Sequence, residues 1–114
     1  MAVSTTLKHA LRRIAAALDE YAKERHWDRE DYQIFYSLDS NWEKIHILFV
    51  AKDFENKNDF ENYASVRGYL DEKLSAEPEL INYLGLVVLS RKQVEEGGIY
   101  AISPEYREYR PSSH

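Results

Sequence analysis

Two short segments that are apolar on both faces constrain the fold of this chain most strongly. Ile45–Ala51 and Leu84–Leu89 are short and rich in branched apolar residues, so each predicts a buried strand rather than a helix. Between them, Asn58 followed by Glu61 is typical of a helix start, and Pro78 cannot continue that helix. A link of this length can return the second strand parallel to the first, which predicts a strand–helix–strand crossover.

Helical periodicity marks two longer segments. A first helix is predicted over residues 6–26 from an apolar stripe at spacings of three and four: Leu7, Leu11, Ile14, Leu18 and Tyr21. A second helix is predicted over residues 59–76 from a similar stripe: Phe60, Tyr63, Val66, Leu70 and Leu74. Both helices can then cover one face of a sheet.

The remaining elements are shorter. Tyr32–Leu38 alternates as a half-buried strand does, and Asp39–Asn41 reads as a turn. Ile99–Ile102 predicts a last short strand, and for Ser90–Glu96 we prefer one helical turn capped by Gly97 over a hairpin loop. The expected fold is a single two-layer α+β domain over residues 1–114, with a mixed four-stranded sheet and the order α-β-β-α-β-β. Residues 105–114 either pack on this domain or form a frayed tail.

Composition excludes several classes of function. The 114 residues include no cysteine, which rules out disulfides, thiolate nucleophiles and the usual structural zinc sites. The net charge of −5 opposes binding to nucleic acid, although residues 1–27 alone carry +2. No apolar run is long enough to span a membrane. We therefore expect a soluble, cytoplasmic protein in which Met1–Leu18 belongs to the folded domain, although its basic, Ser/Thr-containing composition resembles a transit peptide.

No motif for catalysis, metal or cofactor binding is present, and we expect no enzyme activity and no cofactor. The histidines have no metal-ligand spacing, and the glycines are not arranged as a phosphate-binding loop. Val50–Lys52 carries the lysine of a restriction-type nuclease signature without its acid, so no catalytic role is transferred. The alternative is a small enzyme or ligand site assembled from separated residues: Asp31, Asp53, His46 and Arg67.

Three features of the second helix and the C-terminal end are candidates for binding. Arg67 and Asp71 lie four residues apart beside the apolar stripe. They form a salt bridge at the rim of the stripe, or Arg67 faces a ligand. Gly68 beside them indicates close approach by another element or by a ligand. Tyrosine and arginine, which binding surfaces favour, gather near the C-terminus, where packing or fraying is the other interpretation: Tyr100, Tyr106, Arg107 and Tyr109.

The sequence thus favours a non-catalytic interaction module over an enzyme. Its expected partner is another protein or a second copy of the chain, bound through an edge strand or through the tyrosine-rich end. Nucleic acid binding through the basic face of the first helix is less favoured: Lys8, Arg12 and Arg13.

Overall fold

The fold is α+β, with two main helices and a mixed four-stranded sheet, as the sequence predicts. The structure is a computed structural model that describes residues 5–97 and 104–110. Three 3-10 helices lie between the main elements. The elements in chain order are α1 (Thr5–Glu24), η1 (Arg29–Asp31), β1 (Tyr32–Asp39), β2 (Lys44–Ala51), η2 (Lys52–Asn56), α2 (Asp59–Lys73), η3 (Pro78–Tyr83), β3 (Leu84–Ser90), α3 (Arg91–Glu95) and β4 (Arg107–Glu108).

The sheet has the strand order β3-β2-β1-β4. The strands β1 and β2 form an antiparallel hairpin from Tyr32↔Ala51 to Asp39↔Lys44. The strand β3 runs parallel to β2, with Ile47 opposite Leu86, which confirms the predicted crossover through α2. The two residues of β4 pair antiparallel with β1 at Phe35 and Tyr36.

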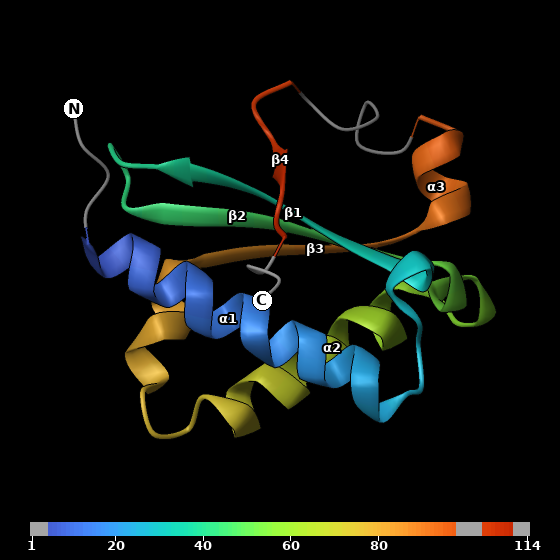
Figure 1. The fold of residues 1–114 in the computed structure, drawn as a ribbon, viewed down its shortest axis with the longest axis horizontal. Coiled ribbons are helices and arrows are strands. Elements are labelled where there is room, and N and C mark those ends of the chain that lie inside the picture. The colour runs from blue at the N-terminus through green and yellow to red at the C-terminus, as the bar shows by residue number, and fades with distance from the viewer. Residues whose placement is uncertain (1–4, 98–103, 111–114) are drawn as a thin grey trace.

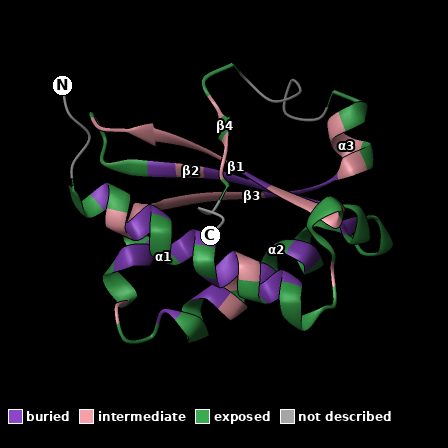
Figure 2. Cartoon of the chain, viewed as in Figure 1, coloured by how far each residue is buried: buried purple, intermediate pink, exposed green. Residues whose placement is uncertain are grey.

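The helices α1 and α2 lie on one side of the sheet and α3 lies on the other (Figure 1). The predicted stripe of α1 is fully buried, and it meets the inward-facing residues of β2 and the later part of α2. Figure 2 shows the buried residues on the sheet-facing sides of both helices and along β2. Burying this apolar area is what holds the layers together, because no disulfide is available. The largest side chains of this core are Tyr21, Phe49, Leu7, Ile14, Leu18, Ile45, Ile47, Leu70 and Leu74.

Side-chain hydrogen bonds mark the β1–β2 turn and the start of α2 where the sequence indicates them. The Asp39 carboxylate accepts hydrogen bonds from the backbone of the β1–β2 turn, and Asn58 caps α2 by accepting from the Glu61 N–H at 2.8 Å. The preferred interpretation of residues 90–97 is confirmed, because Ser90 caps α3 and Gly97 follows it with φ of 83°.

Two details of the prediction are corrected, and a third concerns residues that the structure does not describe. The helices α1 and α2 end two or three residues earlier than expected, at Glu24 and Lys73. A side chain at Gly68 would meet no atom of another described element within 4 Å, so none of these elements approaches the backbone there. The strand expected at 99–102 lies outside the described residues, and the last described strand is β4, within the segment left open as a frayed tail.

Candidate functional site

The outer edge of β3 forms an open groove of about 640 Å³. In the described part of the chain no strand pairs with this edge, because β3 stands at the end of the sheet order. The floor of the groove is Leu86–Leu89 of β3. The helix α2 contributes Asp59 and Tyr63 to the lining. The rest of the lining comes from α3 and the residues after it: Gln93, Glu96 and Gly97. The groove therefore brings an unpaired strand edge together with parts of two helices.

The strand β3 lacks three of the features that commonly protect a sheet edge. Its seven residues include no charge and no proline, and they pair with β2 without a bulge. Along the other edge of the sheet, β4 covers Phe35 and Tyr36, and the Tyr109 N–H donates to the Ile34 carbonyl at 2.7 Å. Long, apolar and uncharged edges readily accept another strand. Within residues 5–97 and 104–110 the two edges of this sheet thus differ, because β4 partly caps one and no strand pairs with the other.

Side chains at the carboxyl end of β3 fix the shape of the groove. Gln93 and Ser90 form a capping box at the start of α3, in which the Ser90 N–H donates to Gln93 Oε1 at 2.8 Å. The Gln93 amide also donates to both Asp59 carboxylate oxygens, at 3.0 and 3.1 Å. This bridge joins α3 to the first turn of α2 at the carboxyl end of the groove.

The aromatic residues at the start of α2 lie outside the core, and Tyr63 is the one that lines the groove. Phe60 is 80% exposed and Tyr63 is 37% exposed, so their predicted place in the core is wrong. The buried face of α2 begins instead with Asn62, whose side-chain amide donates to the Phe54 carbonyl at 2.8 Å. Asn62 satisfies a backbone group of η2, which explains why a polar residue takes the inward position.

Arg67 and Asp71 form the salt bridge at the helix surface that the sequence suggests. The Arg67 Nε and Asp71 Oδ1 atoms lie 3.2 Å apart, and both side chains are at least one-third exposed. Arg67 also donates to the Tyr63 hydroxyl at 3.3 Å. Arg67 therefore orients the tyrosine that lines the groove, and it is not among the residues of the groove itself.

The residues of the tyrosine-rich C-terminal end differ in how far they are buried. Tyr109 packs edge-on against Tyr36, with ring centroids 6.0 Å apart, and it joins the margin of the core. Tyr106 is half-buried, and burial raises its pKa, while Arg107 is exposed. Tyr100 lies outside the described residues. For Tyr109 the packing interpretation is thus the one that the contacts support.

The residues of the alternative site are only partly brought together. Asp31 and Asp53 line one hollow of about 340 Å³ at the end of the sheet where η1 and η2 meet. Each carboxylate already has a local role, because Asp31 accepts from the Asp28 N–H at 2.8 Å and Asp53 accepts from the Asn56 amide at 2.9 Å. His46 lies elsewhere, over Gly85 on the face away from α1 and α2, and Arg67 is on α2. Within residues 5–97 and 104–110, no group of three histidine or acidic side chains could hold a metal ion.

Another hollow, of about 360 Å³, lies beside the first residues of β1. Its lining combines three arginines with three acids, and two of the acids are engaged: Asp19 accepts from the Tyr32 hydroxyl at 2.9 Å, and Glu108 pairs with Arg110. Burial, together with the hydrogen bond to Asp19, raises the pKa of Tyr32 to about 12. The balanced charge of this lining favours neither an anion nor a cation.

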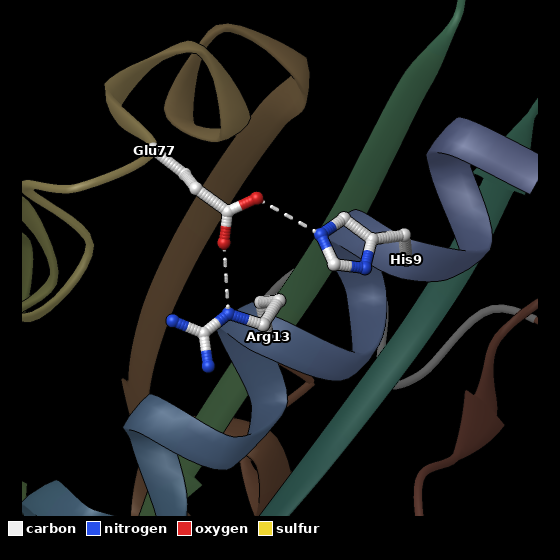
Figure 3. A network of polar contacts seen from close by, with 3 residues as sticks. All are labelled: His9, Arg13 and Glu77. Atoms are coloured by element: carbon white, nitrogen blue, oxygen red, sulfur yellow. Dashed lines mark hydrogen bonds and ion pairs between the residues drawn. The ribbon is translucent and has the colours of Figure 1, made fainter.

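The basic face of α1 is partly used within the fold. Figure 3 shows Glu77, just before η3, between two side chains of α1, with its carboxylate 3.0 Å from the His9 ring and 3.1 Å from Arg13 Nε. The contact with His9, more than the one with Arg13, lowers the pKa of Glu77. Arg13, one of the three basic residues considered for nucleic acid binding, therefore pairs with the segment that leads to β3.

Comparisons with protein families, curated proteins and solved structures find no match for this chain in any of the three. Among the described residues, no helix is both long enough and apolar enough to cross a membrane. The geometry of the groove is therefore the basis for the functional proposal.

Proposed function

We propose that this chain is a protein-interaction module that binds an extended segment of a polypeptide as an additional strand on the outer edge of β3. The observation that carries the proposal is the uncharged edge of β3 at the floor of the groove, with which no other described strand pairs. Strand addition supplies affinity through main-chain hydrogen bonds and specificity through the side chains that line the groove.

The lining of the groove suits such a ligand. Leu86–Leu89 offer apolar contacts, and Tyr63 adds an aromatic ring with a polar tip, which interfaces favour. Both charged residues of the lining, Asp59 and Glu96, are acidic and stand near the carboxyl end of β3. A bound strand would thus meet an apolar floor with polar groups at one end.

Selection from a library of random linear peptides, followed by NMR mapping on the native chain, tests this function. We expect bound peptides to shift the backbone resonances of β3 and of the first turn of α2. The substitution Val87→Lys should weaken this binding at least about tenfold, because a lysine on an edge strand opposes strand addition.

Trp42→Lys is the matched control, because Trp42 is 78% exposed in the β1–β2 turn and does not line the groove. It should leave peptide binding unchanged. A selection without binders on a chain that light scattering shows to be monomeric, or binders that shift resonances only outside β3 and α2, would contradict the proposed function.

A further inference from the structure

We infer that the strand added to β3 is β3 of a second copy of this chain, running antiparallel about a two-fold axis at Val87. This inference rests on the proposed strand addition and names its partner. The product is a homodimer in which the two four-stranded sheets become one continuous sheet. In this antiparallel pairing the two-fold axis is perpendicular to the sheet, so corresponding faces of the two sheets lie on the same side. The helices α1 and α2 of both copies therefore cover one side of the joined sheet.

The free length of β3 sets the register. The Leu84 N–H already donates to the Ile81 carbonyl, and the Ser90 N–H already donates to Gln93. The residues left for a full ladder are therefore 85–89, and their midpoint is Val87. An antiparallel two-fold pairing of these five residues leaves both engaged N–H groups undisturbed.

Side chains in this register are compatible across the axis. Leu86 of one copy faces Val88 of the other on the side of the main helices, and Val87 faces its own equivalent on the opposite side. Gly85 faces Leu89, so the smallest residue of the strand lies opposite a large one. No charged residue faces another, because β3 has none.

Charge at the two ends of the groove selects the antiparallel direction. The acids Asp59 and Glu96 line the groove near the carboxyl end of β3. At the amino end, the Lys44 ammonium donates to the Asn82 carbonyl at 3.0 Å, just before β3 begins. Antiparallel pairing brings the acidic end of each copy toward the lysine end of the other, whereas parallel pairing would bring acids toward acids.

Exposed aromatic area next to the groove enlarges the surface that a second copy can bury. Phe60 precedes Tyr63 by three residues, which places the two rings on neighbouring positions of the same helix surface. A stable dimer commonly buries about 800 Å² per copy, more than a strand edge alone provides. Phe60, 80% exposed, is a source of that additional area.

Light scattering and single-cysteine crosslinking of the full chain test the dimer. We expect the mass of a dimer, and Val87→Lys should raise its dissociation constant by about 100-fold, because two lysines then meet at the axis. The absence of native cysteine makes Val87→Cys a clean probe. Residues directly opposite in antiparallel strands have Cα atoms about 4.5–5.5 Å apart, within reach of a disulfide.

Val87→Cys should therefore form a covalent dimer on mild oxidation, whereas Ala16→Cys, exposed on α1, should not. Crosslinking reports on the strand pairing even if Val87→Lys fails to fold. A monomer at high concentration that still binds peptides at β3 would overturn the homodimer and leave the proposed function standing. A monomer that binds no peptide would overturn both, and equal crosslinking of the two cysteine variants would overturn the register.

Discussion

At the scale of single residues, the buried polar side chains that the structure describes have hydrogen-bond partners. Tyr32 donates its hydroxyl hydrogen to Asp19, and Tyr21 shares a hydrogen bond of 2.8 Å with Ser65. Among the described residues, no buried side-chain nitrogen or oxygen lacks a hydrogen-bond partner. Partnered groups of this kind specify how α1 meets its neighbours.

The titration of Tyr32 follows from its surroundings. Burial and the Asp19 carboxylate raise the pKa of Tyr32 to about 12 from an ordinary value of 10.0, because both disfavour the phenolate. The folded state therefore keeps the proton longer than the unfolded state does. The stabilising effect is fully present below pH 10 and is lost as the pH rises from 10 toward about 12.

The difference between the absorbance titrations of the native chain and of Tyr32→Phe measures this pKa. We expect a midpoint near 12, and Asp19→Asn should lower it part of the way, because burial would remain. A midpoint at 10 in the native chain would show that Tyr32 is not shielded.

At the scale of elements, α2 shows the limit of reading periodicity. Its apolar stripe includes Phe60 and Tyr63, yet the helix turns Asn62 inward and leaves both aromatic residues outside. The hydrogen bonds that Asn62 donates to Phe54 and Lys57 are made to a segment that folds back against the helix start. A stripe of apolar residues cannot reveal such a contact, because it depends on the path of the preceding chain.

Asn62→Ala should destabilise the fold by about 1–3 kcal/mol, because it leaves the buried Phe54 carbonyl of η2 without its donor. Chemical denaturation measures this change in the free energy of unfolding. Ala64→Ser, at an exposed position on the same helix, is the control and should change the stability by no more than about 0.5 kcal/mol. Equal effects of the two substitutions would show that Asn62 does not secure η2.

At the scale of the whole molecule, the sheet is stable at its centre and open at one edge. The strand β2 has hydrogen-bonded neighbours on both sides, and its residues from Leu48 to Ala51 are buried on both faces. The strand β4 contributes only two residues. Resistance to local opening depends on such burial and pairing.

Hydrogen exchange should reflect this gradient. We expect the amides of Ile45–Ala51 to exchange slowest and those of Arg107 and Glu108 to be among the fastest of the strand amides, as read by NMR after transfer into deuterated water. Uniform protection across the four strands would contradict a fold held together mainly at its centre.

The sequence alone determined the type and order of the main elements, the parallel return of β3 and the cap at Asn58. These features depend on local periodicity and on neighbouring residues. It also indicated the Arg67–Asp71 pair, since residues four apart on a helix must be neighbours.

Only the tertiary structure decided that β3 stands at an edge, that Tyr63 lines its groove while Phe60 is exposed, and that Asp31 and Asp53 share a hollow without His46. A strand that is apolar on both faces has the same sequence pattern at the centre of a sheet and at an unpaired edge. The difference lies in which strand comes to pair beside it, and that is set by contacts between segments far apart in the chain.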